Sequence, residues 1–288
     1  MTTRRTLLLG AMAVPVLNAC APLPATQATR ATLTELESDV GGRLGVMGID
    51  TGTGRRIQHR ADERFAFCST FKVLAASAVL RQSAADPGLL QRRVRYARSD
   101  LVNYSPITEK HVNDGMTLGE LCAAALQYSD NTAGNVLTRQ AGGLEAVTAF
   151  ARTLGDQTFR MDRWETALNT AVPGDPRDTC TPGDMARNLQ RLALDDALPQ
   201  AQRNQLQAWM RDNTTGGQRI RAASGNWVVA DKTGSGDYGT TNDIGVVWPV
   251  ARAPLVLAIY YTQDRKDATM RNEVVASAAR IAIRTLTA

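Results

Sequence analysis

The chain has 288 residues, of which 43% are hydrophobic and 5% aromatic, and it carries 33 basic against 28 acidic side chains. This composition is enough for a large buried core and excludes a disordered or fibrous protein. The formal charge of +5 comes from basic residues scattered among acidic ones, so no positive stripe is long enough to follow a phosphate backbone. We therefore expect no nucleic-acid partner, and either one large domain or two interleaved ones.

The first 20 residues have the features of an export signal. Two arginines at positions 4 and 5 precede a short apolar run, which Pro15 interrupts before it is long enough to span a bilayer. Paired arginines are typical of a twin-arginine signal, but an ordinary secretory signal can contain them too. The residues up to Cys20 fit lipoprotein processing, with Cys20 acylated, as well as cleavage that removes Cys20. We expect a periplasmic protein without a membrane span, either free or lipid-anchored at Cys20, with a tether over residues 21–31.

Cysteine and histidine are too few and too scattered for a metal centre. The four cysteines are Cys20, Cys68, Cys122 and Cys180, and the two histidines are His59 and His111. None of them has the spacing of a ligand set. If Cys20 carries lipid, three cysteines remain, and an odd number cannot form a closed disulfide framework. We expect buried free thiols, and neither a metal nor any other cofactor.

Hydrophobic periodicity places strands near both ends of the chain and helices between them. A short helix (32–40) and two strands around a glycine-containing turn (43–50 and 55–60) come first. Helices are then expected over about 70–86, 117–128, 131–140, 143–153 and 181–194, followed by strands at 227–233, 243–248 and 255–262 and a helix at 267–286. Strands from both ends imply one antiparallel sheet. We therefore predict an α/β part (32–61 and 212–288), an inserted helical part (62–211) and a substrate cleft between them.

Ser69 and Lys72 form the first of three candidate catalytic patterns. Three residues apart in a helix, the two side chains face the same side and lie within hydrogen-bonding reach. A serine at a helix start lies where unpaired N–H groups favour developing negative charge, and a neighbouring base makes its hydroxyl nucleophilic. Taken alone, the pattern also fits an exposed serine at a helix start beside a surface lysine.

Two further patterns follow along the chain. Segment Ser129–Asn131 lies between two apolar helices, where a second hydroxyl could pass a proton to a leaving group, although such residues also commonly cap helices. Segment Lys232–Gly234 ends a strand, where the lysine can bind a carboxylate and the glycine lets a ligand approach the strand edge, although a strand that ends in a turn has the same features. Two of the chain's four lysines, Lys72 and Lys232, stand in the three patterns. Together the three patterns are a much stronger indication than any one of them.

In this order, the three patterns resemble those of class A β-lactamases and penicillin-binding proteins. Segments 126–133 and 231–243 are similar to the cefotaxime-hydrolysing group of class A enzymes, and the resemblance covers about residues 30–288. It implies a five-stranded antiparallel sheet flanked by N- and C-terminal helices, with an inserted all-helical domain. It also implies a monomeric hydrolase that acts on small β-lactam molecules without a cofactor.

The loop from Arg163 to Asp178 distinguishes a hydrolase from a protein that penicillin acylates without being hydrolysed. In the family, such a loop brings a glutamate over the nucleophile, where it holds a water together with an asparagine, and the matching residues are Glu165 and Asn169. A carboxylate is suited to take a proton from water that attacks an ester. Arg163 and Asp178 match the ion pair that joins the loop ends. Thr166 departs from the proline that often follows the glutamate.

The resemblance also assigns a two-step reaction. Ser69 attacks the β-lactam carbonyl, and the backbone N–H groups of Ser69 and Ser235 form the oxyanion hole. Ser129 protonates the leaving nitrogen, and a water activated by Glu165 releases the acyl group. Whether Lys72 or Glu165 takes the first proton stays open. The implied catalytic residues are Ser69, Lys72, Ser129, Glu165, Asn169 and Lys232.

Further residues match the family's substrate contacts. Tyr104 fits a cleft rim on which a ligand packs, although a partly buried core tyrosine would fit as well. Arg219 stands where some class A enzymes carry a carboxylate-binding arginine, whereas the cefotaxime group uses a position that is Asn272 here. Ser235 favours oxyimino-cephalosporins as substrates. The expected substrate-binding residues are Asn103, Tyr104, Asn131, Arg219, Thr233, Gly234 and Ser235.

The cysteine pattern argues against strong carbapenem hydrolysis. Relatives with that activity pair a cysteine at the place of Cys68 with one at the place of Gly236, so that disulfide is absent here. Cys122 likewise lacks a partner that some relatives have, because Ala76 stands in its place.

Two alternatives to a hydrolase are a DD-peptidase or transpeptidase, which passes its acyl group to peptidoglycan, and a non-enzymatic β-lactam sensor, which stays acylated. The pair Glu165 and Asn169 argues against the first alternative. The lack of an extra signalling segment in the sequence argues against the second.

Overall fold

The computed structural model describes the backbone from Ala25 to Ala288 and the side chains from Thr32 onward. The expected export signal and Cys20 lie outside the described residues. The tether expected over residues 21–31 is wrong from Ala25 on, because helix α1 (Ala25–Val40) already begins there. No glycine or proline lies between Ala25 and Val40, so nothing in this segment interrupts a helix.

Five strands from both ends of the chain form one antiparallel sheet in the order β2-β1-β9-β8-β7. They are β1 (Arg43–Asp50), β2 (Arg56–His59), β7 (Val228–Gly236), β8 (Thr240–Trp248) and β9 (Leu255–Thr262). Strand β1 pairs with β9 along its whole length, from Arg43 opposite Thr262 to Asp50 opposite Leu255. This pairing joins the two ends of the chain in one sheet, as the sequence predicts.

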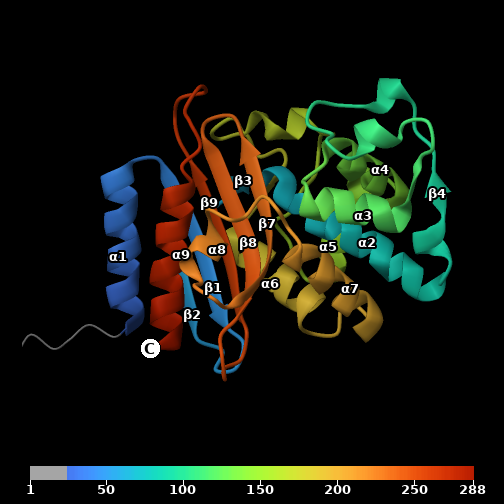
Figure 1. The fold of residues 1–288 in the computed structure, drawn as a ribbon. Helices are drawn as coiled ribbons and strands as arrows, with labels where there is room; N and C mark the ends of the chain where they lie inside the picture. Colours follow the sequence, from blue (N-terminus) through green and yellow to red (C-terminus); the bar gives the residue numbers. More distant parts are fainter. Residues whose placement is uncertain (1–24) are drawn as a thin grey trace, which may run out of the picture.

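Helices α1 and α9 (Asn272–Thr287) lie side by side on one face of this sheet (Figure 1). Their apolar side chains form a core with the strand residues that face them, such as Leu44 and Tyr261. Helix α9 begins at Asn272 and not at residue 267, since residues 263–271 form a loop in which Gln263 Nε2 donates to the carbonyl of Thr269 at 2.8 Å. The expected five-stranded antiparallel sheet with flanking terminal helices is confirmed.

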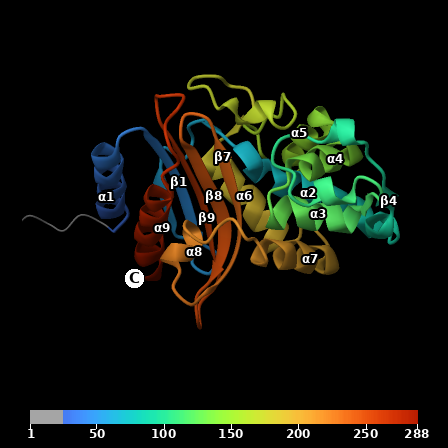
Figure 2. The same ribbon diagram turned by 45° about the horizontal axis from the view of Figure 1, so that its top comes forward.

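The helical part lies on the other side of the sheet (Figure 2). Its helices are α2 (Lys72–Ala85), α3 (Leu118–Gln127), α4 (Asn131–Ala141), α5 (Leu144–Thr153), α6 (Pro182–Ala193) and α7 (Gln200–Arg211). The short α8 (Ile220–Ala223) follows α7 and packs against α9, on the other face of the sheet. Helix α6 packs against β1, β8 and β9 and also against α7. Helix α6 therefore joins the sheet to the other helices. The expected division of the chain into an α/β part and an inserted helical part, with bounds near residues 62 and 212, stays a prediction.

Two short strand pairs connect the loops around the helical part. Strand β3 (Phe65–Ala66) pairs with β6 (Thr179–Cys180), and β4 (Arg93–Val94) pairs with β5 (Met116–Thr117). The first pair brings the segment before Ser69 next to the end of the loop that contains Glu165.

Helix α2 lies at the centre of the helical part, in contact with α3, α4, α5 and α7. Most of its side chains are buried, which is typical of a helix that is apolar all round. A short 3-10 turn (Cys68–Phe71) leads into it and packs against β7. Ser69 is therefore held between the central helix of the helical part and the edge strand of the sheet.

Candidate active site

A pocket of about 330 Å³ lies where β7 faces the helical part. It brings together eight of the residues expected from the sequence: Ser69, Tyr104, Ser129, Asn131, Asn169, Arg219, Thr233 and Ser235. Thr215 and Met270 also line it, and the sequence did not point to either. Lys72, Glu165 and Lys232 lie directly beneath the lining residues, as their hydrogen bonds show.

Ser69 stands between two groups that could take its proton. Its Oγ accepts a hydrogen bond from Lys72 Nζ at 2.8 Å and donates one to Glu165 Oε1 at 3.3 Å. All three side chains are buried. In this buried setting, an oriented acid–base pair acts more strongly than it would in bulk water.

Lys72 has oxygen atoms on every side. Besides Ser69 Oγ, its ammonium nitrogen lies 2.8 Å from the carbonyl oxygen of Ser129, 2.6 Å from Asn131 Oδ1 and 2.9 Å from Glu165 Oε1. Its stem needs the glycine at position 134 of α4, since a Cβ on Gly134 would lie 2.8 Å from Lys72 Cε. Sequence reasoning missed Gly134, because no local pattern marks a glycine that makes room for a side chain from another helix.

The hydroxyl of Ser129 is in contact with the second lysine of the site, Lys232. Lys232 Nζ donates to Ser129 Oγ at 2.9 Å and to the carbonyl of Thr233 at 2.7 Å. Burial lowers the pKa of Lys232 well below its usual value, and the nearby charge of Lys72 lowers it further. The hydroxyl of Ser129 is thus placed where a proton can pass between Lys232 and a bound molecule.

Glu165 and Asn169 form a pair above the nucleophile. Asn169 Nδ2 donates to Glu165 Oε2 at 2.5 Å, and Asn169 Oδ1 has no hydrogen-bond partner among the described residues. The backbone of Glu165 is held by Asn135, whose side chain accepts from its N–H at 3.0 Å and donates to its carbonyl at 3.1 Å. The peptide bond between Glu165 and Thr166 is cis. Asn135 was not predicted, although it lies four residues after Asn131 and so on the same face of α4.

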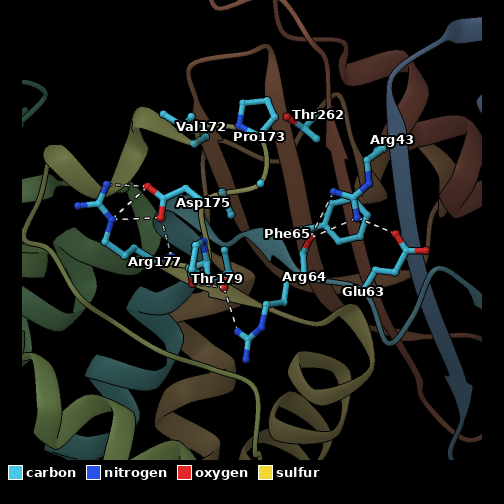
Figure 3. Close-up of a pocket in the computed structure, with 14 residues that line it drawn as sticks. Arg43, Glu63, Arg64, Phe65, Val172, Pro173, Asp175, Arg177, Thr179 and Thr262 are labelled. Atoms are coloured by element: carbon cyan, nitrogen blue, oxygen red, sulfur yellow. Dashed lines mark hydrogen bonds and ion pairs between the residues drawn. The ribbon is translucent and has the colours of Figure 1, made fainter.

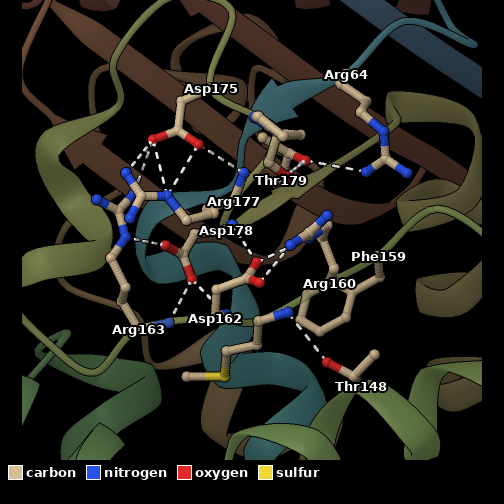
Figure 4. Close-up of polar contacts among 12 residues, drawn as sticks. Arg64, Thr148, Phe159, Arg160, Asp162, Arg163, Asp175, Arg177, Asp178 and Thr179 are labelled. Atoms are coloured by element: carbon tan, nitrogen blue, oxygen red, sulfur yellow. Dashed lines mark hydrogen bonds and ion pairs between the residues drawn. The ribbon is translucent and has the colours of Figure 1, made fainter.

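The loop that carries Glu165 is joined at its ends by a buried ion pair (Figure 4). Arg163 Nε lies 2.5 Å from Asp178 Oδ2, which confirms the expected pair. Asp178 is completely buried and also accepts from the backbone N–H groups of Asp162 and Arg163. In return, the N–H of Asp178 donates to Asp162 Oδ2 at 3.1 Å, and Arg160 pairs with the same carboxylate.

The wall of the pocket formed by Arg219 and the end of β7 is positively charged. Arg219 Nη2 donates to Ser235 Oγ at 2.9 Å, and its Nε donates to Asn272 Oδ1 at 2.7 Å. Burial lowers the pKa of Arg219, but a guanidinium keeps its charge at any ordinary pH. Arg219 therefore lies beside Ser235 and in contact with Asn272, the position at which the cefotaxime group carries its own arginine.

Tyr104 lies at the mouth of the pocket and not in the core. Its side chain is 56% exposed, which excludes the alternative of a core tyrosine. The backbone around it is fixed, because the N–H of Asn131 donates to the Tyr104 carbonyl at 3.0 Å and Asn131 Nδ2 donates to the Asn103 carbonyl at 2.9 Å.

Two glycines let β7 approach the turn that carries Ser69. A Cβ on Gly234 would lie 2.7 Å from the carbonyl oxygen of Phe67, and one on Gly236 would lie 2.9 Å from Cys68 Sγ and 2.5 Å from the carbonyl of Asn169. Cys68, Cys122 and Cys180 are all buried and unpaired, as the sequence suggested.

A model of the β-lactamase enzyme family matches residues 28–286 of the chain. The chain belongs to the β-lactamase enzyme family. The β-lactamase OXY-1 of Klebsiella oxytoca is 56% identical over 280 residues, which cover 96% of each chain. The β-lactamase Toho-1 of Escherichia coli matches equally well, at 56% over 280 residues and 96% of each chain. A solved structure of a β-lactamase from Desulfarculus baarsii is similar with a TM-score of 0.90 at 54% identity, covering 93% of this chain and 100% of that one.

These comparisons confirm the resemblance to class A β-lactamases. A second, larger pocket of about 580 Å³ lies between the loop 171–177 and the sheet (Figure 3). That pocket contains none of the expected catalytic residues. Four of its charged side chains form two ion pairs. Arg43 lies 2.7 Å from Glu63, and Arg177 lies 2.7 Å from Asp175.

Proposed function

We propose that this β-lactamase opens the amide ring of penicillins and cephalosporins through an acyl-enzyme on Ser69. The single observation that carries the proposal is the placement of Ser69 Oγ 2.8 Å from Lys72 Nζ and 3.3 Å from Glu165 Oε1. A serine hydroxyl becomes nucleophilic when a base within hydrogen-bonding distance takes its proton. The backbone N–H groups of Ser69 and Ser235 then stabilise the oxyanion that forms when Ser69 attacks.

Ser129 completes the first half of the reaction. As the carbon–nitrogen bond of the ring breaks, the Ser129 hydroxyl gives its proton to the departing nitrogen and recovers one from Lys232. Lys232 donates to Ser129 Oγ at 2.9 Å, which supports this path. Lys72 donates to the Ser129 carbonyl at 2.8 Å and so helps to position the backbone of Ser129. Lys72 and Glu165 both remain candidates for the base that accepts the first proton.

Glu165 and Asn169 perform the second half. Together they hold a water against the ester carbon, and Glu165 takes its proton during attack, so that the acyl group leaves Ser69 as a carboxylic acid. The unpaired Asn169 Oδ1 and the adjacent Glu165 carboxylate support this assignment. A DD-peptidase or a sensor has no use for a water-activating pair here, which makes the hydrolase the better proposal.

The positive wall of the cleft is the proposed site for the substrate carboxylate. Lys232, Arg219, Thr233 and Ser235 supply charge and hydroxyl donors at one end of the pocket. Asn131, the Asn103 segment and the ring of Tyr104 would contact the acylamino side chain, with Gly234 leaving room for the ligand along β7. Ser235 makes oxyimino-cephalosporins part of the proposed substrate range, and the absence of a disulfide at Cys68 makes strong carbapenem hydrolysis an unfavourable proposal.

We further propose that the enzyme works as a monomer in the periplasm, with acylation of Cys20 and removal of Cys20 as the two alternatives for its N-terminus. None of the helices between Ala25 and Ala288 is long and apolar enough to cross a membrane. Mass spectrometry of the protein from cell envelopes would separate the alternatives, because an acylated Cys20 adds the mass of its lipid.

Hydrolysis of a chromogenic cephalosporin by wild type and by Glu165→Ala tests the mechanism. We expect rapid turnover by wild type and, in the variant, a covalent adduct on Ser69 that persists and is visible by mass spectrometry. Equal turnover in both proteins would remove Glu165 from the mechanism. Stoichiometric labelling of the wild type without turnover would favour a DD-peptidase or a sensor.

A further inference from the structure

Tyr260 of strand β9 lies directly behind the turn that carries the nucleophile. Its side chain is completely buried, and its hydroxyl oxygen lies 3.2 Å from Thr70 Oγ1 and 3.4 Å from Cys180 Sγ. Thr70 is the residue after Ser69, and Cys180 follows the loop that carries Glu165. None of these three groups lines the pocket or has a part in the proposed reaction.

The direction of the hydrogen bonds follows from counting donors. The carbonyl oxygen of Phe67 can only accept, so Thr70 Oγ1 must give its single proton to Phe67, 2.9 Å away. The contact between Thr70 and Tyr260 therefore requires the Tyr260 hydroxyl to donate. The Tyr260 oxygen is then free to accept from the Cys180 thiol, which gives one chain from Cys180 through Tyr260 and Thr70 to Phe67.

The hydroxyl of Tyr260 and the thiol of Cys180 both keep their protons. Burial raises the pKa of Tyr260 well above its usual value, and burial likewise raises that of Cys180. The chain of donors is thus intact at neutral pH, and its contribution is one of position and not of titration.

The chain ends on the carbonyl that begins the catalytic turn. Phe67 O also accepts from the backbone N–H of Thr70 at 3.2 Å and from Asn242 Nδ2 at 3.3 Å, so strands β8 and β9 both hold it. Cys68, the next residue, has a positive φ of 45°, which a non-glycine residue adopts only where its surroundings hold it. The backbone N–H of Ser69 follows immediately and is the proposed oxyanion donor.

We propose that Tyr260 is a positioning residue for the oxyanion hole: its hydroxyl, acting through Thr70, fixes the turn Phe67–Phe71 and so aims the backbone N–H of Ser69. This inference rests on the proposed role of that N–H group. A donor that is displaced by a fraction of an ångström loses much of its effect on the transition state, whereas substrate binding, which depends on other groups, is retained.

The test compares Tyr260→Phe with Tyr261→Phe in the full-length enzyme. Tyr261 is the adjacent residue on β9 and is equally buried, but it faces the α1 and α9 side, where its hydroxyl donates to the carbonyl of Gly41 at 3.0 Å. Each variant therefore removes one buried hydroxyl from the same strand. Only Tyr260→Phe breaks the chain that leads to Ser69.

We expect Tyr260→Phe to lower the acylation rate constant for a cephalosporin about five- to tenfold, the usual effect of one lost buried hydrogen bond, with the dissociation constant of the non-covalent complex unchanged. Its inhibition constant for phenylboronic acid, which forms a tetrahedral adduct on the serine, should rise by the same factor. Tyr261→Phe should change neither quantity by more than about twofold, since its lost hydrogen bond affects stability alone.

Two variants of Thr70 form a second part of the test, which stays decisive if Tyr260→Phe does not fold. Thr70→Ser retains the hydroxyl and should act like wild type, whereas Thr70→Val should lose as much activity as Tyr260→Phe. Adding Tyr260→Phe to Thr70→Val should cause no further loss, because both break the same chain. Normal acylation and boronate affinity in Tyr260→Phe or in Thr70→Val would overturn the inference. The proposed function fails separately, if the wild type itself shows no turnover.

Discussion

The ammonium nitrogen of Lys72 lies 2.9 Å from Glu165 Oε1, and neither side chain has any exposed surface. These are the two groups that could accept the proton of Ser69, and they are also each other's counter-ion. A buried ion pair of this kind adds little net stability, but the loss of one partner leaves the other as an unpaired buried charge. Catalysis and stability are therefore linked at this pair.

Single and double replacement of the pair should show this link. We expect Lys72→Met to slow acylation by about 10²- to 10⁴-fold, the usual contribution of a proton-transfer group. It should also lower the free energy of unfolding by about 3 to 5 kcal/mol, since Glu165 is left unpaired. Lys72→Met combined with Glu165→Gln should recover most of that stability in urea unfolding, without recovering activity. Stability losses that simply add would contradict the link.

The lowered pKa of Lys232 predicts an alkaline limit to substrate binding. As the pH rises through this pKa, Lys232 loses its proton and its positive charge, and affinity for the substrate carboxylate falls. We expect KM for a cephalosporin to rise on the alkaline side in wild type. In Lys232→Arg the guanidinium stays charged, so the rise should move to higher pH. If KM rises at the same alkaline pH in both enzymes, the rise belongs to a group other than Lys232.

Gly134 should tolerate no side chain, because its Cβ would lie 2.8 Å from Lys72 Cε. Gly134→Ala should lower kcat/KM by about 10- to 100-fold by displacing the Lys72 ammonium group. Thermal unfolding should change less, since alanine is favoured over glycine in a helix by about 1 kcal/mol. Gly217→Ala is the matched control, because a Cβ at Gly217 has no neighbour within 4 Å. Wild-type activity in Gly134→Ala would mean that Lys72 has room to move.

The pair Arg163–Asp178 should matter for both the fold and the second half of the reaction. Asp178→Asn leaves Arg163 without its buried counter-ion, which costs about 3 kcal/mol or more. The loosened loop should slow deacylation about tenfold, seen as a longer-lived acyl-enzyme in single-turnover measurements. Asp267→Asn breaks an Arg–Asp pair that is almost fully exposed, and it should change neither quantity measurably. Equal effects of the two variants would argue against the role of the loop anchor.

Glu37 should make the stability of the sheet depend on pH. Burial alone would raise its pKa, but hydrogen bonds from Arg60, the N–H of Leu44 and His59 outweigh burial and lower it. A carboxylate whose folded pKa is lowered stabilises the protein above its unfolded pKa, and this contribution disappears as the pH falls through the folded value. We therefore expect Glu37→Gln to lower the free energy of unfolding by about 1 to 3 kcal/mol at pH 7. The difference from wild type should shrink below about pH 4, the ordinary range of a glutamate. A difference independent of pH would show that packing and not charge is lost.

The element order was predictable because hydrophobic period, turn glycines and capping residues are local features. A helix was expected from residue 117, and α3 begins at Leu118, where Thr117 and Glu120 form a capping box. The errors fall at element ends. Residues 25–31 and 267–271 were assigned to the wrong state, because whether a short polar segment continues a helix depends on what it packs against.

The sequence by itself indicated the candidate catalytic side chains and their order, because Ser69 with Lys72, Ser129 with Asn131, and Lys232 with Gly234 are each close in sequence. Only the tertiary structure decided which of these groups meet. Lys72 contacts Glu165, Asn135 holds the Glu165 backbone, and Tyr260 reaches the residue next to Ser69, each from a different helix, loop or strand. Such contacts depend on how β7, β9, α2 and α4 pack together, and no local pattern contains that information.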